Sequence, residues 1–292
     1  LKVIIGIPAF NEEENIAAII IKLKRKYDHV LVCDDGSSDM THDIASSLGA
    51  IVVKHPTNLG YGAAIKTIFN EARKIDGDIL ITFDADRQHK ISEIDSVLKP
   101  ISENKADIVI GSRFLGKTKE IPKYRKIGIK MITGLTNTLT GSEITDAQSG
   151  FRAYSKKVLN EISPTESGMG ISTEILIKSS KKQMRISEVP ITISYEDNTP
   201  SQEPISHGTS VVFSTIKHVA IERPLLYYGV TGLCFIITGL IFGGWTIQIF
   251  SEQEVLAPGI ALIGIGGVIL GTILLITATI LFSIINVIRE KR

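Results

Sequence analysis

Two aspartates and a glutamine, spaced as Asp84-x-Asp86-x-Gln88, follow directly after the apolar segment 79–83. The β-branched residues of that segment predict a buried strand, so the polar side chains would stand at its carboxyl end. Two carboxylates at this spacing can bind Mg²⁺ or Mn²⁺ and leave coordination positions for the oxygens of a diphosphate. The metal would neutralise charge on a departing diphosphate. An acidic turn after a strand is also a common structural feature.

Further clusters of polar residues and glycines recur along the chain. They are Pro8-Ala-Phe10-Asn-Glu12, Asp34-Asp35-Gly36-Ser37-Ser38-Asp39, Asn58-Leu-Gly60-Tyr-Gly62, Gly111-Ser112-Arg113-Phe114 and Asp146-Ala-Gln-Ser149-Gly150-Phe151-Arg152-Ala-Tyr154. Carboxylates suit ribose hydroxyls and metals, and arginine suits phosphate. Asp34 and Asp35 also fit an Asp-Gly turn before a capped helix. Segment 58–62 equally fits a turn into a helix, with glycines that let the backbone approach a ligand.

Alternating strands and helices must position these clusters. Apolar runs predict strands at 2–8, 30–34, 50–54, 79–84 and 108–111, and helical patterns cover 12–26, 41–48, 62–75 and 91–104. Asn11 and Glu14 resemble a capping box that opens the first helix. This alternation indicates an α/β fold with a largely parallel, doubly wound sheet, in which ligands bind beyond the carboxyl ends of the strands. Segments 115–130 and 194–210 are expected to be loops over the site.

Two long uncharged segments follow this part of the chain. Segment 225–250 has 26 residues and segment 260–288 has 29, without Asp, Glu, Lys or Arg. Each exceeds the roughly 20 residues that span a bilayer. Basic residues flank the pair and the connection contains two glutamates, which predicts that both ends and the catalytic domain are cytoplasmic. Glycines at 239, 243, 264, 267 and 271 would allow close helix packing, within the hairpin or between subunits.

Charge and cysteine content exclude some classes of protein. The chain has 32 Lys and Arg against 31 Asp and Glu, and this balance gives no indication of nucleic-acid binding. Cys33 falls in a predicted buried strand and Cys234 in a predicted span, so no disulfide is expected. The first residues run straight into a strand, and no signal peptide is expected.

The clusters together, in this order, resemble the family 2 glycosyltransferases of the GT-A fold, in particular the dolichyl- and undecaprenyl-phosphate sugar synthases. The resemblance covers roughly residues 2–190, and it implies a Rossmann-like catalytic domain followed by a two-helix transmembrane hairpin. The implied nucleotide-sugar contacts are Pro8, Phe10, Glu12, Cys33, Asp35, Asp84, Ala85 and Arg113. The implied metal ligands are Asp84, Asp86 and Gln88, for Mg²⁺ or Mn²⁺. The implied catalytic residues are Asp86, Asp146 and Arg152.

The resemblance also implies a polyprenyl phosphate as acceptor. Near neutrality a phosphate monoester is largely ionised, so it needs positioning and electrostatic help more than a general base. Arg152 would hold the acceptor phosphate, and Asp146 would orient Arg152 or the sugar. A buried Asp–Arg pair is the alternative interpretation. Glu174 could serve the site or merely start a helix, and His89 is expected to be structural or exposed. Direct attack would invert the anomeric configuration.

One feature departs from the family pattern. Close relatives carry a basic stretch before the membrane, whereas this chain has no Lys or Arg between Arg185 and Lys217. His207, Ser210 and Lys217 are the possible substitutes. The expected organisation is a catalytic domain at 1–204, an amphipathic juxtamembrane segment at 205–224 and the hairpin at 225–292.

Three other functions compete with this interpretation. A processive polysaccharide synthase would be expected to carry a Gln-x-x-Arg-Trp motif, which Gln183-Met-Arg185 does not match. A nucleotidyltransferase would show a glycine-rich loop after the first strand, where this chain has Pro8-Ala-Phe10. A catalytically silent membrane anchor that binds a sugar nucleotide stays open, because the basic stretch is missing. Homo-oligomers through the glycine-rich spans are possible.

Overall fold

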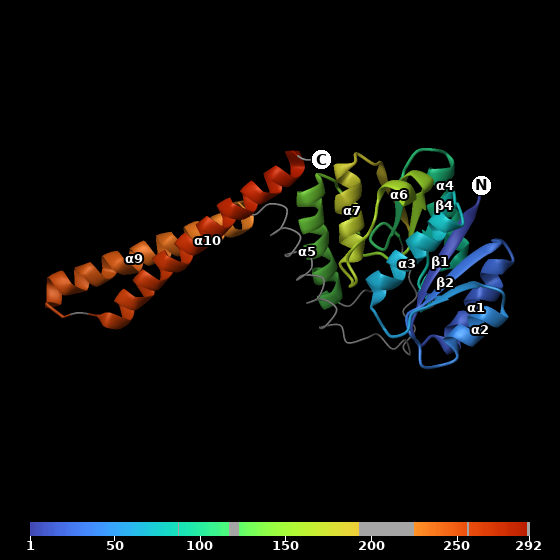
Figure 1. The fold of residues 1–292 in the computed structure, drawn as a ribbon, viewed down its shortest axis with the longest axis horizontal. Coiled ribbons are helices and arrows are strands. Elements are labelled where there is room, and N and C mark those ends of the chain that lie inside the picture. The colour runs from blue at the N-terminus through green and yellow to red at the C-terminus, as the bar shows by residue number, and fades with distance from the viewer. Residues whose placement is uncertain (87, 117–122, 193–224, 256, 291–292) are drawn as a thin grey trace. The chain divides into compact units, whose positions relative to one another are not determined.

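The structure is a computed structural model of the 292-residue chain, and it describes residues 1–86, 88–116, 123–192, 225–255 and 257–290 (Figure 1). The chain divides into two compact units, Leu1–Thr215 and Ile216–Arg292, and each is described by itself. The predicted loop at 194–210 and the predicted amphipathic segment at 205–224 lie outside the described residues.

The first unit contains a seven-stranded sheet in the order β3-β2-β1-β4-β6-β5-β7. Its strands are β1 (Val3–Ala9), β2 (His29–Asp34), β3 (Ile51–Lys54), β4 (Ile79–Thr82), β5 (Ile108–Ser112), β6 (Arg152–Ser155) and β7 (Ile186–Pro190). Neighbouring strands are parallel, except that β6 is antiparallel to both β4 and β5. The sheet is therefore largely parallel, as the sequence predicts.

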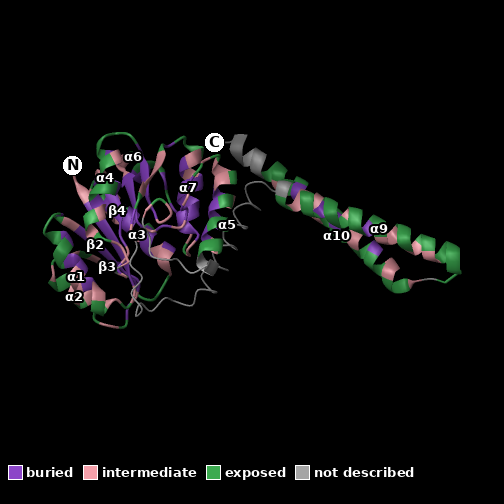
Figure 2. Cartoon of the chain, turned by 180° about the vertical axis from the view of Figure 1, so that it is seen from behind, coloured by how far each residue is buried: buried purple, intermediate pink, exposed green. Residues whose placement is uncertain are grey.

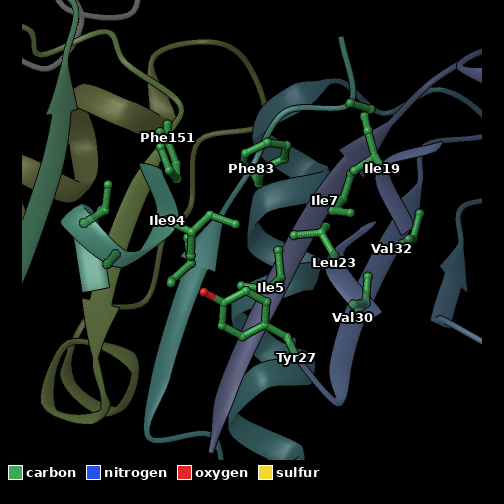
Figure 3. Close-up of a cluster of buried hydrophobic side chains, with 14 of the residues drawn as sticks. Ile5, Ile7, Ile19, Leu23, Tyr27, Val30, Val32, Phe83, Ile94 and Phe151 are labelled. Carbon is green, nitrogen blue, oxygen red and sulfur yellow. The ribbon is translucent and has the colours of Figure 1, made fainter. Parts of the chain in front are cut away.

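Helices cover both faces of this sheet. They are α1 (Glu13–Lys24), α2 (Thr41–Ser47), α3 (Tyr61–Lys74), the 3-10 turn η1 (Ile91–Glu93), α4 (Ile94–Ser102), α5 (Lys123–Thr140), α6 (Lys156–Glu161) and α7 (Ile171–Lys181). Successive strand residues point to opposite faces. Ile5 and Ile7 of β1 pack with Leu23 of α1 (Figure 3), whereas Ile4 packs with Ile68 of α3. Both faces are buried (Figure 2), which explains the continuous apolar runs.

The five predicted strands and four predicted helices are confirmed, with small shifts at their ends. Strands β6 and β7 and helices α5, α6 and α7 are additional elements. The prediction of a loop over 115–130 is wrong from residue 123 onward, where α5 begins. The predicted capping box is also wrong, because α1 has Glu12 at its N-cap and no side-chain cap. The Asn11 side chain instead accepts a hydrogen bond from the Ser38 amide at 2.9 Å.

The second unit is a pair of long apolar helices. A π-helical turn, η2 (Leu225–Gly229), leads into α9 (Val230–Gln253), and α10 (Pro258–Glu290) follows. Segments Tyr227–Gln253 and Pro258–Ile284 are long and apolar enough to cross a membrane, with mean hydropathies of 1.9 and 2.5. Their side chains are largely exposed (Figure 2), unlike those of a core helix.

Glycines join these two helices at close range. A Cβ atom added to Gly239 would lie 2.7 Å from the carbonyl oxygen of Gly264, and one added to Gly271 would lie 2.5 Å from that of Gly232. Both separations are shorter than van der Waals contact, so only glycine fits without movement. The prediction that glycines allow close helix packing is thus confirmed within the hairpin.

Candidate active site

The polar clusters meet at one edge of the sheet. Parallel strands β1, β2 and β4 all end at this edge, and in the register Ala9 lies opposite Asp34 while Gly6 lies opposite Thr82. Strand β6 runs the other way, so the residues that precede Arg152 arrive at the same edge. The fold thereby brings the segments after β1, β2 and β4 together with segment 146–151, although these are far apart in the sequence.

Three carboxylates form the acidic part of this edge. Burial, and then the neighbouring Asp84 carboxylate, raise the pKa of Asp86 to about 6, and Glu12 acts in the same direction. The backbone amide of Gln88 donates to Asp86 Oδ1 at 3.0 Å. Within the described part of the chain, no group of three His, Cys, Asp or Glu side chains is arranged to hold a metal ion. Asp84 and Asp86 are instead a pair of close anions, which suits a cation that takes its other ligands from a substrate.

Asp84 has neighbours that the sequence did not reveal. The Tyr61 hydroxyl donates to Asp84 Oδ1 at 3.3 Å, and His89 Nε2 lies 3.4 Å from Oδ2. Burial, and then Asp84, raise the pKa of Tyr61 well above its ordinary value, so the hydroxyl keeps its proton. The predictions for His89 were a structural or an exposed residue, and its side chain is only 5% exposed.

The predicted nucleoside contacts fall into two groups. Phe10 and Glu12 are half-buried at the edge, and the Glu12 amide donates to Thr41 Oγ1 at 2.8 Å. Pro8, Cys33 and Ala85 are buried, and Cys33 is fully enclosed in the core beneath the sheet. Burial, and then Asp35, raise the pKa of the Cys33 thiol to about 12. The Cys33 side chain therefore packs in the core, and its contact with a nucleotide sugar stays a prediction.

Asp35 is occupied by the protein itself. Its carboxylate accepts hydrogen bonds from the amides of Leu59 at 3.0 Å and Gly60 at 2.8 Å, and His55 Nδ1 lies 2.6 Å from Oδ1. Only 4% of the residue is exposed. Asp35 therefore holds the 58–60 turn, whereas the family resemblance implied contact with the nucleotide sugar. The sequence analysis missed His55, although its place directly after β3 marks the same edge of the sheet.

The glycines of segment 58–62 serve packing between loops. Gly60 has a φ of 97°, and a Cβ atom there would lie 2.8 Å from the carbonyl oxygen of Ser167. A Cβ atom on Gly62 would lie 2.5 Å from the carbonyl oxygen of Gly168. Another loop of the chain therefore fills the space on the Cβ side of both glycines, which favours the interpretation of segment 58–62 as a turn into a helix.

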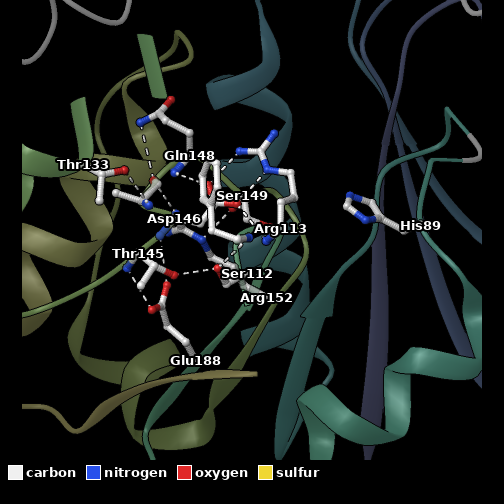
Figure 4. Close-up of polar contacts among 12 residues, drawn as sticks. His89, Ser112, Arg113, Thr133, Thr145, Asp146, Gln148, Ser149, Arg152 and Glu188 are labelled. Atoms are coloured by element: carbon white, nitrogen blue, oxygen red, sulfur yellow. Dashed lines mark hydrogen bonds and ion pairs between the residues drawn. The ribbon is translucent and has the colours of Figure 1, made fainter. Parts of the chain in front are cut away.

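An ion pair between the half-buried Arg113 and the buried Asp146 joins the end of β5 to segment 146–151 (Figure 4). Arg113 Nε and Nη2 donate to the two oxygens of Asp146 at 2.6 and 2.7 Å. Burial opposes the ionised form of Asp146, but the Arg113 guanidinium outweighs it and lowers the pKa of that carboxyl. Glu188, which the sequence analysis missed, accepts from the amides of Thr145 and Asp146 at 2.8 and 3.0 Å. Asp146 thus orients Arg113, whereas the prediction was that Asp146 orients Arg152 or the sugar.

Arg152 is fully enclosed, with no exposed surface. Its guanidinium donates to the carbonyl oxygens of Ser149, Ser172 and Ala147 at 2.8, 2.9 and 2.7 Å (Figure 4). In this position Arg152 ties segment 146–151 to the start of α7. This burial argues against the prediction that Arg152 holds an acceptor phosphate, because its side chain does not reach the surface of the site.

Glu174 has a comparable role in α7. Its carboxylate accepts from the amides of Thr165 and Glu166 at 3.0 and 2.9 Å, and Lys178 Nζ lies 2.7 Å away. Only 1% of the residue is exposed. Glu174 therefore lies in the first turn of a helix, as one interpretation of the sequence had it, and anchors the loop that packs on Gly60 and Gly62.

Comparisons with known proteins agree with this architecture. Residues 4–163 match the model of the Glycosyl transferase family 2. The chain is 33% identical, over 70% of its length and 89% of the relative, to a UDP-N-acetylglucosamine--dolichyl-phosphate N-acetylglucosaminyltransferase from Methanococcus voltae. It is 32% identical, over 75% of its length and 63% of the relative, to a dolichol-phosphate mannosyltransferase from Pyrococcus furiosus.

A solved structure shares the fold. It is the glucosyl-3-phosphoglycerate synthase of Mycobacterium tuberculosis, in complex with Mn²⁺, uridine-diphosphate and glucosyl-3-phosphoglycerate. The TM-score is 0.59 at 20% identity, and the match covers 74% of this chain and 79% of the other. The sheet carries acidic residues at the carboxyl ends of its strands, the family model matches most of that sheet, and the chain is similar to these transferases. We conclude that the chain belongs to the Glycosyl transferase family 2.

Proposed function

We propose that the protein is an inverting glycosyltransferase that moves a sugar from a nucleotide-diphosphate sugar to a polyprenyl phosphate at a membrane. Family membership supports glycosyl transfer, and the names of the Methanococcus and Pyrococcus relatives support a dolichyl-type phosphate as acceptor. The two membrane-length helices support action on a lipid. Among nucleotide donors, the Methanococcus relative favours a UDP-sugar over a GDP-sugar.

The pair of carboxylates, Asp84 and Asp86, is the observation that carries this proposal. Two anions held close together at a buried edge repel each other, as the raised pKa of Asp86 reflects, and a divalent cation relieves that repulsion. Asp84 and Asp86, with Gln88 beside them, would hold Mg²⁺ or Mn²⁺. The bound ion would supply charge neutralisation for the leaving diphosphate.

The chain's own residues would bind and orient the reactants. Phe10 and Glu12 would border the nucleoside, with the Glu12 carboxylate accepting hydrogen bonds. Arg113 would contact a phosphate, since Asp146 fixes its guanidinium in one direction. The acceptor phosphate is already ionised near neutrality, so its oxygen would attack the anomeric carbon directly and invert it. An α-linked donor would give a β-linked lipid product.

A processive synthase fits the structure less well. Gln183 and Arg185, the nearest approach to its motif, lie before β7, and Arg185 bonds to Asp107 at the start of β5. Parallel strands β5 and β7 begin at the edge opposite the acidic site. Residues placed there would not touch an acceptor bound beside Asp86.

Membrane orientation is part of the proposal. Basic residues on the outer flanks of the hairpin, together with Glu252 and Glu254 at the end of α9, favour a cytoplasmic catalytic domain. A cysteine introduced at Glu252 in a Cys234→Ala background tests this with a membrane-impermeant maleimide. Labelling of intact cells is expected, and labelling only after permeabilisation would reverse the orientation.

The reaction can be tested directly in membranes that contain the protein. They would be incubated with polyprenyl phosphate, Mg²⁺ or Mn²⁺, and a panel of radiolabelled UDP- and GDP-sugars, with Asp86→Ala as control. We expect label in an extractable lipid from one donor and none with the control. Metal-dependent label in a polymer would favour the processive synthase. Nucleotide binding without transfer to any acceptor would favour a silent anchor.

A further inference from the structure

Asp84 is enclosed by three neighbours that come from three different segments. Tyr61 approaches Oδ1 from the start of α3, and His89 approaches Oδ2 from the segment after β4. Gly150 forms the third side, because a Cβ atom on it would lie 2.5 Å from Asp84 Oδ2 and 2.7 Å from the Tyr61 hydroxyl. The Asp84 carboxylate thus has little freedom to rotate, although a quarter of its side chain, 24%, is exposed.

Tyr61 is itself held in place by a neighbouring loop. Gly60 and Gly62 on either side of it pack against the backbone of Ser167 and Gly168, and the Ala63 amide donates to the Ser167 carbonyl at 3.2 Å. The hydroxyl reaches Asp84 from this fixed base. The backbone contacts on both sides of Tyr61 therefore fix the position from which its hydroxyl reaches the Asp84 carboxylate.

His89 is fixed by aromatic packing. Its ring lies between those of Phe83 and Phe151, with centroid separations of 5.9 and 5.1 Å. Nδ1 is buried and has no hydrogen-bond partner within the described ranges, whereas Nε2 faces the Asp84 carboxylate. A proton on Nε2 is favoured, because a lone pair there would point at an anion. Both oxygens of Asp84 therefore face donors.

We propose that Tyr61 and His89 are positioning residues that fix the Asp84 carboxylate, with Gly150 as the wall behind it, so that Asp84 and Asp86 bind one divalent cation with the nucleotide diphosphate. The inference rests on the proposed function, since it concerns the same site. Groups that orient a metal ligand from outside affect metal affinity strongly, and their loss costs about tenfold or more.

The test measures Mn²⁺ binding to the full-length protein in nanodiscs, from the electron paramagnetic resonance signal of free Mn²⁺ in the presence of UDP. Tyr61→Phe removes one hydroxyl, and we expect the Kd for Mn²⁺ to rise about tenfold. Tyr27→Phe is the matched control, because its hydroxyl donates to Asp95 at 3.2 Å and lies outside the site. That variant should bind as the parent does.

His89 and Gly150 give independent variants. His89→Gln keeps an N–H donor, so its Kd for Mn²⁺ should stay within about threefold of the parent value, whereas the Kd of His89→Leu should rise about tenfold. A purely structural role would affect both substitutions alike. Gly150→Ala should weaken binding by the steric route, without removing any hydrogen-bond donor.

Asp84→Asn distinguishes a failure of the proposed metal site from a failure of the positioning role. If it binds Mn²⁺ as well as the parent does, the proposed metal site fails. If Asp84→Asn loses binding while Tyr61→Phe, His89→Leu and Gly150→Ala all bind as the parent, the site stands and the positioning role is overturned. A tenfold loss in Tyr61→Phe, with Tyr27→Phe unchanged, supports the inference.

Discussion

Replacing Arg152 by methionine should unfold the catalytic domain at lower temperature without a selective effect on the acceptor. The change leaves the carbonyl oxygens of Ala147, Ser149 and Ser172 without the donor that now satisfies them, in a region where all three residues are buried. A buried acceptor left unsatisfied costs about 1–3 kcal/mol, and three carbonyl oxygens lose their donor here, so the lower end of that range already gives about 3 kcal/mol. We therefore expect a loss of about 3–5 kcal/mol in the free energy of unfolding. For a domain of this size the melting midpoint should fall by about 6–20 °C.

A thiol-reactive fluorophore can follow this transition. Cys33 is fully buried in the domain core, so in a Cys234→Ala background the dye reacts only when the domain opens. Arg185→Met is the control, because its guanidinium lies at the surface with a half-exposed side chain, and a much smaller shift is expected. The reasoning is refuted if Arg152→Met melts within about 2 °C of the parent and selectively raises the KM for polyprenyl phosphate. That pattern would return Arg152 to the acceptor site.

Three further predictions concern the acidic pair, the packed loops and the hairpin. In metal-free protein the folded-state pKa of Asp86, about 6, lies above the ordinary aspartate value of 3.8, so the free energy of unfolding should fall as pH rises from about 4 to about 6. The free energy of unfolding of Asp86→Asn should therefore exceed that of the parent by about 3 kcal/mol at pH 7 and equal it below pH 4. Parallel pH–stability curves for the variant and the parent would contradict this. Gly62→Ala should lower the free energy of unfolding by about 1–3 kcal/mol, because its Cβ meets the backbone of residues 166–168. The control Gly134→Ala in α5 meets nothing and should be neutral or slightly stabilising. Equal melting midpoints for the two variants would count against the loop contact. Gly239→Leu should loosen the α9–α10 hairpin, so the protein should migrate more slowly in detergent gels. Gly244 has open space around it, and Gly244→Leu should migrate as the parent does. Identical migration of the two variants would argue against close packing at Gly239.

The hydrophobic pattern of the sequence was sufficient to predict the strands of the first half of the sheet. Strands β1, β2 and β4 are buried on both faces, so each reads as an unbroken apolar run with a polar cluster at its end. Strands β6 and β7 lack this signal. The first begins with an arginine and has only four residues, and the second, at the sheet edge, mixes Ser187 and Glu188 with apolar residues.

Partner choice within the site could not be predicted from residue types. Asp146 had two arginines available, and only the fold shows that Arg113 reaches it while Arg152 turns to backbone carbonyls. For Cys33 the local pattern of a buried strand predicted the burial, and the family resemblance alone suggested ligand contact. Backbone carbonyls and amides carry no sequence signature, so residues that bind them, such as Asp35, look like free functional groups in a sequence.

The reversed direction of β6 has a consequence for the order in which the site is completed during synthesis. Asp84 and Asp86 leave the ribosome early, but Gly150 beside them and the Ser167 loop that supports Tyr61 belong to segments made much later. A nascent chain that ends before these segments carries the acidic motif without Gly150 beside Asp84 and without the loop that supports Tyr61. The proposed nucleotide site is thus completed only near the end of synthesis of the first unit, shortly before the first membrane-length helix is made.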